Sequence, residues 1–192
     1  MGVRNYLIEG VSGAGKTTVA EELERRGCHV IHGDRALAYL GDPKTGGALE
    51  PPMPGGVTDI ARWRHARWIW NVDEVERLAA DRSSAQSFFC GGARNHRHFI
   101  HLFDEVFVLD IDADTLSRRL AARAEDEFGG RPAERRLIAR LHATQEDLPK
   151  TAVNIDATAP IARVVDEILS RCGAAGERRC SSRPPLMTSS RF

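Results

Sequence analysis

Short apolar runs alternate along the chain with segments in which apolar residues recur every three or four positions. The runs predict strands at about 4–9, 28–32, 87–90, 106–109 and 152–155. The periodic segments predict helices at about 16–26, 58–81, 94–102, 113–123, 132–146 and 160–171. Alternating strands and helices indicate an α/β fold in which helices cover both faces of a parallel sheet. We therefore expect ligands to bind beyond the carboxyl ends of the strands.

The same pattern predicts one folded domain at residues 1–172. A Gly/Pro-rich stretch at 41–57 predicts a long loop within it. From Gly173 the composition changes to Gly, Ser, Arg and Pro without any periodicity. Residues 173–192 are therefore predicted to be a disordered tail.

The overall composition favours a globular protein of balanced charge. The 192 residues are 42% hydrophobic, and 27 Lys and Arg balance 27 Asp and Glu. This balance gives no support to binding of nucleic acid or of a membrane surface. The sequence shows no apolar run of about 18 residues and no signal-peptide pattern. We expect a cytoplasmic protein without nucleic-acid or membrane partners, and both a monomer and a homodimer stay open.

The first predicted strand leads into a complete G-x-x-x-x-G-K-[ST] phosphate-binding loop. Its glycines permit a tight turn with inward N–H groups, which form an anion site together with the start of the next helix. Lys16 is predicted to reach the β- and γ-phosphates, and the Thr17 hydroxyl is predicted to bind Mg²⁺. The nucleotide-contacting residues expected here are Gly10, Ser12, Gly13, Ala14, Gly15, Lys16, Thr17 and Thr18.

Polar groups also follow the second and third predicted strands. Asp34 is predicted to accept the proton of an attacking hydroxyl and to help hold Mg²⁺ through water. The alternative for Asp34 is a cap of the next helix. Gly91 and Gly92 allow close approach of a substrate, and Arg94 offers a charged fork for a phosphate, carboxylate or polyol. A tight turn with an exposed arginine is the alternative there.

Arginines cluster at about 119–136 and predict a lid over the phosphates. Arg119 and Arg123 are four residues apart and share one helix face, so they are the predicted catalytic cations. A Gly-rich acidic turn and then Arg131, Arg135 and Arg136 follow. Phosphoryl transfer depends mainly on positioning and charge neutralisation, which a closing arginine-bearing flap would supply. A solvated charged face is the alternative.

Asp156 to Pro160 joins the last predicted strand to the last helix. An adenine contact is predicted for Thr158 and Pro160, although a plain helix start accounts for the segment as well. Asp110 follows the fourth predicted strand as a Walker B Asp would, but it leads directly into the lid helix. We therefore expect Asp110 to be structural.

With these motifs the chain resembles the P-loop small-molecule kinases, which include adenylate, shikimate and gluconate kinases. The residues that carry the resemblance are Gly10 to Thr18, Asp34, Gly91-Gly92, Arg119 to Arg123 and Asp156 to Pro160. The resemblance implies a P-loop NTPase fold of three α/β/α layers, with a five-stranded parallel sheet and a helical lid. It also implies an acceptor-binding helical region at about 35–82 and the use of ATP and Mg²⁺.

The chain departs from named members of that group. It has neither the Asp-x-Asp after strand two nor the triple glycine after strand three of shikimate kinases, so their substrates do not carry over. The predicted activity is transfer of the ATP γ-phosphate to a hydroxyl of a nucleoside, sugar or related metabolite. An antibiotic-modifying or toxin-type kinase and a regulatory NTPase without kinase activity are the alternatives.

All three tryptophans fall in the predicted acceptor region. Trp63 and Trp70 are seven residues apart and are expected to share a helix face, whereas the spacing of Trp68 with later valines predicts core packing. Trp63 and Arg67 are predicted to bind the acceptor, with core packing an equal alternative. The histidines of the next predicted helix do not share one face, which favours a surface helix over a metal site.

Overall fold

A computed structural model of the chain describes residues 3–53, 56 and 59–181, and for 174–181 it describes the backbone alone. Five parallel strands form the central sheet in the order β2-β5-β1-β6-β7. Their bounds are β1 (Arg4–Glu9), β2 (His29–His32), β5 (Gln86–Cys90), β6 (Glu105–Asp110) and β7 (Val153–Asp156). The predicted five-stranded parallel sheet is therefore confirmed.

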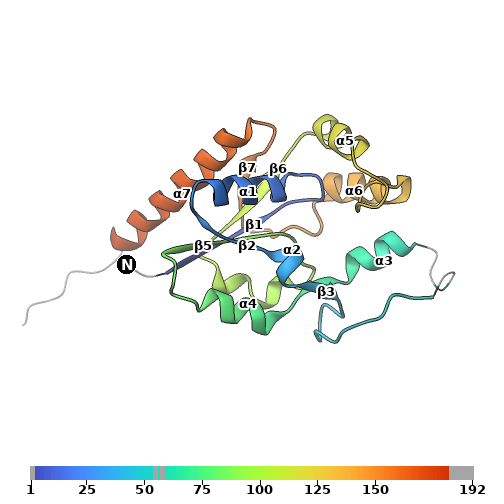
Figure 1. Cartoon of the computed structure of the whole chain (residues 1–192), viewed down its shortest axis with the longest axis horizontal. Coiled ribbons are helices and arrows are strands. Elements are labelled where there is room, and N and C mark those ends of the chain that lie inside the picture. The colour runs from blue at the N-terminus through green and yellow to red at the C-terminus, as the bar shows by residue number, and fades with distance from the viewer. Residues whose placement is uncertain (1–2, 54–55, 57–58, 182–192) are drawn as a thin grey trace, which may run out of the picture.

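Helices cover both faces of this sheet (Figure 1). On one face lie α1 (Lys16–Arg25) and α7 (Ile161–Ser181), and on the other lies α4 (Val72–Ala79). Successive residues of β1 serve the two faces in turn, as strand geometry requires. Tyr6 and Ile8 join the core under α1 and α7, whereas Leu7 packs with Val75 of α4. The expected three-layer α/β/α arrangement is confirmed.

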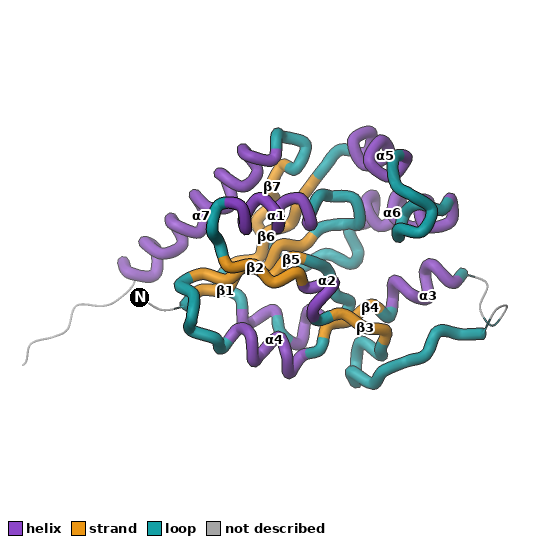
Figure 2. Tube along the Cα trace, viewed as in Figure 1, coloured by secondary structure: helices purple, strands orange, loops and turns teal. Residues whose placement is uncertain are grey.

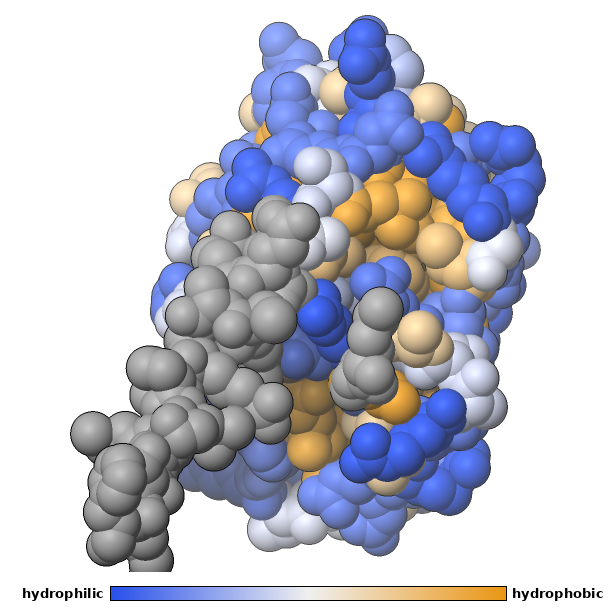
Figure 3. Space-filling model, turned by 90° about the vertical axis from the view of Figure 1, so that its left-hand side faces the viewer, coloured by the Kyte–Doolittle hydropathy of each residue, from blue (hydrophilic) through white to orange (hydrophobic). Residues whose placement is uncertain are grey.

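The remaining elements gather at the carboxyl ends of the strands (Figure 2). They are α2 (Gly33–Ala36), β3 (Ala38–Leu40), α3 (Ile60–Ala66), β4 (Trp68–Trp70), α5 (Ala113–Ala121) and α6 (Pro132–Thr144). Figure 3 shows the opposite end of the molecule, where hydrophilic side chains surround areas of apolar surface. In the described part of the chain, no helix has both the length and the apolar character needed to cross a membrane.

The prediction of one continuous helix at 58–81 is wrong, because β4 separates α3 from α4. β4 pairs antiparallel with β3, so that Trp70 lies opposite Ala38 and Trp68 lies opposite Leu40. A Trp-Ile-Trp sequence suits a strand, since aromatic and β-branched residues pack well on a pleated surface. The next helix starts afresh at Asn71, whose side chain accepts a hydrogen bond from a backbone N–H in the first turn of α4.

This break changes how the three tryptophans lie relative to one another. Trp70 is fully buried and stacks on Phe99, with ring centroids 5.6 Å apart. Trp63 lies on α3, and the guanidinium carbon of Arg67 lies over its ring, 4.6 Å from the ring centroid. Trp63 and Trp70 therefore do not share a helix face, and Trp68 is half-buried rather than a core residue.

Two further segments differ from the sequence predictions. Instead of an α-helix at 94–102, the chain forms two 3₁₀ turns, η1 (His96–His98) and η2 (Ile100–Leu102). The last helix continues to Ser181, so the first residues of the predicted disordered tail at 173–192 are helical. The rest of that predicted tail, 182–192, lies outside the described residues.

Candidate active site

The loop between β1 and α1 forms a cradle for phosphate. Gly15 is the N-cap of α1 with φ at 107°, and no side chain caps the helix, which leaves its first N–H groups available to an anion. Gly13 has φ at 96°, and a Cβ on it would lie 2.8 Å from Leu116 Cδ1 of α5. Both positions therefore need glycine, and this uncapped helix start fits a nucleotide phosphate.

Lys16 lies across this loop. Its Nζ donates hydrogen bonds to the carbonyl oxygens of Gly10, at 2.6 Å, and of Val11, at 3.2 Å. Burial lowers the pKa of Lys16, while the nearby charges of Asp34 and Glu9 act in the opposite direction. The ammonium group is thus held at the site where the predicted phosphates would bind.

Two arginines of the lid segment reach the loop from α5 and from the turn that follows it. Arg119 donates to the carbonyl oxygens of Ala14, at 2.9 Å, and Ala157, at 2.9 Å. Arg123 Nη1 donates to Ser12 Oγ at 2.9 Å and also bonds the carbonyl oxygen of Phe128. The predicted pair at i and i+4 therefore converges on the phosphate loop.

The other predicted lid arginines do not contact the phosphate loop through a hydrogen bond among the described residues. Arg135 donates from Nε to the carbonyl of Gly129 and from Nη2 to that of Gly130, and Arg131 donates to the carbonyl of Glu125. These bonds shape the lid's own turn. Arg136 is exposed on α6.

A cavity of about 470 Å³ lies on the nucleotide side of the loop. Its lining includes Gly13 to Val19, Arg119 and the segment that starts α7. From that segment it takes Ala157, Ala159 and Ile161, but not the predicted Thr158 and Pro160. Thr158 instead donates from its N–H and its hydroxyl to Asp156 Oδ1. The residues of this segment that line the cavity are thus apolar neighbours of the two residues predicted from the sequence.

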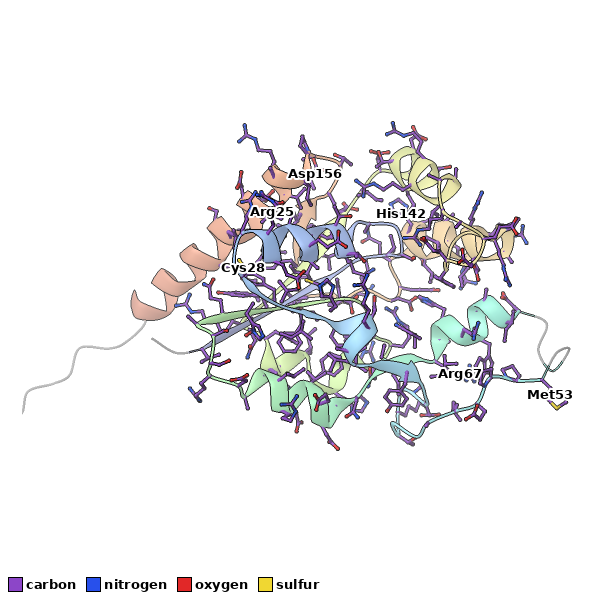
Figure 4. All side chains as sticks on the ribbon, in the orientation of Figure 1. Arg25, Cys28, Met53, Arg67, His142 and Asp156 are labelled. Atoms are coloured by element: carbon purple, nitrogen blue, oxygen red, sulfur yellow. The ribbon has the colours of Figure 1, made fainter. Side chains whose placement is uncertain are left out.

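A second cavity, of about 570 Å³, lies on the other side of Asp34. It is lined by parts of the phosphate loop, by Leu40, Arg64, His65 and Trp68 of the predicted acceptor region, and by Phe128, Ile138, Leu141 and Leu148. The predicted Trp63 and Arg67 are not among its lining residues. In the view of Figure 4, Arg67 lies on the side of α3 away from α6.

Asp34 lines both cavities, as do Ser12, Lys16 and Arg123. The Asp34 side chain is exposed at the start of α2. Its Oδ1 accepts hydrogen bonds from Gly92 N, at 3.1 Å, and from Trp68 Nε1, at 3.3 Å. The carboxylate is therefore fixed between the phosphate cradle and the second cavity.

The turn after β5 supports this position of Asp34. A Cβ on Gly91 would lie 2.6 Å from Trp70 Cζ2 and 2.8 Å from Asp34 Oδ1, so only glycine fits there. Gly92 lines the second cavity. The two glycines thus allow the backbone to approach Asp34 closely.

Arg94 belongs to a charged network that the sequence did not reveal. Arg94 Nη1 lies 3.1 Å from Asp147 Oδ2, and His65 Nε2 lies 2.6 Å from the same oxygen. Burial raises the pKa of Asp147, but the His65 hydrogen bond and the Arg94 charge outweigh it, so the pKa is lowered. The network joins α3, the turn after β5 and the segment after α6.

Glu9 is the other site residue that sequence reasoning missed. It ends β1, is 1% exposed, and accepts a hydrogen bond from Ala93 N at 3.3 Å. Its Oε2 has no hydrogen-bond partner among the described residues. Burial raises the pKa of Glu9 to about 7, against the opposing charges of Arg94 and Lys16. A carboxylate at the end of the apolar run 6–8 was the available signal.

The residues present fit Mg²⁺ in the way that nucleotide enzymes hold it. The Thr17 hydroxyl at the start of α1 and the Asp34 carboxylate are oxygen donors beside the phosphate cradle, and both line the nucleotide-side cavity. In the described ranges, no group of three or more His, Cys, Asp or Glu side chains is arranged to hold a metal ion. This donor set suits Mg²⁺, which is usually held by few protein oxygens together with substrate phosphates. Asp110 lines neither cavity.

Comparison with known proteins places the chain in a family. A family model described as an AAA domain matches residues 7–159. The chain belongs to this AAA domain family. The matched range contains the phosphate loop, Asp34, the turn after β5 and the lid arginines. A search of curated protein sequences finds no match.

Several solved structures of kinases have a fold similar to that of this chain. A gluconokinase from Sinorhizobium meliloti is 19% identical, with 94% of this chain and 98% of that chain covered and a TM-score of 0.54. A shikimate kinase from Bacteroides thetaiotaomicron is 14% identical, with 88% and 98% covered and a TM-score of 0.55. A shikimate kinase from Acinetobacter baumannii, in complex with shikimate, is 21% identical, with 90% and 94% covered and a TM-score of 0.53. The resemblance to P-loop small-molecule kinases is thus confirmed for the fold.

Proposed function

We propose that this AAA domain protein is an ATP-dependent kinase that transfers the γ-phosphate of ATP to a hydroxyl of a small molecule. One observation carries the proposal: the Asp34 carboxylate lines the nucleotide-side cavity and the second cavity at once. A group in that position can accept a proton from a hydroxyl in the second cavity while the γ-phosphate lies against Lys16. The second cavity is thus the proposed acceptor cavity.

The residues divide the work of the transfer between them. The loop amides and Lys16 hold the phosphates, and Arg119 and Arg123 neutralise the charge that develops on the transferring group. Asp34 takes the acceptor proton as the new oxygen–phosphorus bond forms and the bond to the β-phosphate oxygen breaks, which leaves ADP. Thr17 would hold Mg²⁺, with Asp34 helping through water, and the ion would supply further charge neutralisation on the phosphates.

The proposal is tested by release of ADP that depends on an acceptor. Purified protein with ATP and Mg²⁺ is incubated with nucleosides, sugars and aminocyclitols, and the phosphorylated product is identified by mass spectrometry. Asp34→Asn should lower turnover by roughly a hundredfold or more while ATP still binds. Asp110→Asn, which removes a charge at a strand end outside both cavities, is the matched control and should keep its turnover.

Another outcome would identify a regulatory NTPase. ATP would then turn over at one rate with every acceptor, and only a protein partner would change that rate. The Asp34→Asn variant would in that case lose no acceptor-dependent turnover.

A further inference from the structure

Apolar side chains from several elements line the acceptor cavity. Leu40 of β3 and Trp68 of β4 contribute to it, as do Phe128 of the lid segment and Ile138 and Leu141 of α6. Ile138 and Leu141 are buried at 1% and 6% exposure, so they belong to the packed structure. Apolar and aromatic surfaces of this kind gain most from a flat, weakly polar ligand.

The flat surface of Trp68 begins next to the proposed base. The indole Nε1 donates to Asp34 Oδ1 at 3.3 Å, which orients the ring. On the lid side, Phe128 stacks on His65 with an interplanar angle of 10° and ring centroids 6.3 Å apart. An acceptor hydroxyl at Asp34 therefore places the rest of the molecule among aromatic side chains.

The basic side chains around the cavity already bond other protein groups. Arg94, whose side chain is 12% exposed, and His65 both bond the carboxylate of Asp147. Lys16 and Arg123 bond the phosphate loop and are assigned to the nucleotide phosphates. Burying a carboxylate requires a charge partner, and the charge of Arg94 is already shared with Asp147, although its buried Nε has no hydrogen-bond partner among the described residues.

The other charges of the lining largely offset one another. Asp34 and Glu127 line the cavity and would repel a substrate carboxylate, whereas Arg64 would attract it. All three side chains are exposed, so solvent and salt weaken the repulsion and the attraction alike. The preference for an uncharged molecule therefore rests on Arg94, whose charge is shared with Asp147.

From these observations we infer that the acceptor is an uncharged hydroxyl compound with a flat ring system, such as a nucleoside, and not a sugar acid or other carboxylate. The inference rests on the proposed kinase function, because it assigns the second cavity to the acceptor. In this arrangement a hydroxyl of the sugar lies at Asp34 and the base lies against Trp68.

The first experiment measures substrate class by ADP release. Wild-type protein is compared with the five common nucleosides, with the neutral polyols glucose and myo-inositol, and with the carboxylates gluconate and shikimate. We expect at least one nucleoside to exceed every polyol and carboxylate by about tenfold or more in kcat/KM. Transfer that is fastest to gluconate or shikimate would overturn the substrate class and leave the kinase function standing.

The second experiment detects binding without turnover. Nucleosides are titrated in the presence of a non-hydrolysable ATP analogue, and tryptophan fluorescence is recorded. We expect quenching that is lost in Trp68→Phe and kept in Trp63→Phe, since Trp63 does not line the cavity. Binding without turnover would support the substrate class and refute the kinase function, and a failure of both measurements would refute both.

The third experiment tests the charge argument. Asp147→Asn releases Arg94 from its partner, so the preference for a carboxylate over a nucleoside should rise by about tenfold. Glu146→Gln is the matched control, because it removes an adjacent exposed carboxylate that pairs with Arg140 outside this cavity. An unchanged preference in Asp147→Asn, with a melting temperature near that of wild type, would contradict the proposed role of Asp147.

Discussion

Replacing Glu9 by Gln should change how the free energy of unfolding depends on pH. Glu9 is buried at the end of β1, and its pKa rises from an ordinary value of 4.5 to about 7 because its carboxylate is desolvated. The folded state therefore holds a proton more tightly than the unfolded state does. This contribution to stability is present below pH 4.5 and is lost as the pH rises to about 7.

The size of the effect follows from that interval. At about 1.4 kcal/mol for each pH unit, the ionisation of Glu9 lowers the free energy of unfolding by roughly 3 kcal/mol above pH 7. Gln keeps the shape and does not ionise. Relative to wild type, the Glu9→Gln variant should thus gain about 2 kcal/mol or more in stability between pH 5 and pH 8.

Urea unfolding followed by circular dichroism at several pH values between 5 and 8 measures this difference. The change of this difference with pH is the quantity of interest, because any constant cost of placing an amide at the buried site cancels between two pH values. Glu21→Gln, on the exposed side of α1, serves as the control. Stability curves that stay parallel, within about 0.5 kcal/mol, would show that Glu9 does not exchange its proton as burial predicts.

Three further substitutions have defined outcomes. Lys16→Ala should abolish phosphoryl transfer while circular dichroism shows a folded protein, because the phosphates lose the cation that the loop holds beside them; normal ADP release would contradict the assignment. Gly91→Ala should cost about 2 kcal/mol, since its Cβ would lie 2.6 Å from Trp70, and an unchanged melting temperature would show that the turn adapts freely. Arg123→Ala should lower turnover by roughly a hundredfold or more, whereas the exposed lid cation in Arg136→Ala should be dispensable; equal losses in both would favour a diffuse charge effect.

The phosphate cradle could be predicted from the sequence because its parts are contiguous. Gly13, Gly15 and Lys16 act through one turn of backbone and one helix start, so their spacing already contains the geometry. The lid pair was predictable for a similar reason, since residues four apart on a helix share a face. The order of strands and helices likewise indicated the sheet.

The acceptor side was predicted less well, because the spacing of apolar residues does not show which segments pair as strands. Trp68 and Trp70 fit a helical stripe, but they pair as a strand with Ala38 to Leu40, about thirty residues earlier. As a result of this pairing, Trp68 lines the second cavity, whereas Trp63 does not. Thr158 and Pro160 do not line the nucleotide-side cavity, whereas their neighbours Ala157 and Ala159 do. Which of these residues line the cavity depends on the direction of each side chain, which the sequence does not give.

The sequence by itself determined the fold class, the phosphate loop and the positions of Asp34 and the lid arginines at or after strand ends. Only the tertiary structure decided that Asp34 lies between two cavities, that Glu9 is buried behind the turn after β5, and that Asp147 holds Arg94 and His65. The physical reason is how far apart in the sequence the interacting residues lie. Backbone turns and helix faces are set by neighbouring residues, whereas burial, charge pairing and cavity walls arise where segments far apart in the chain meet.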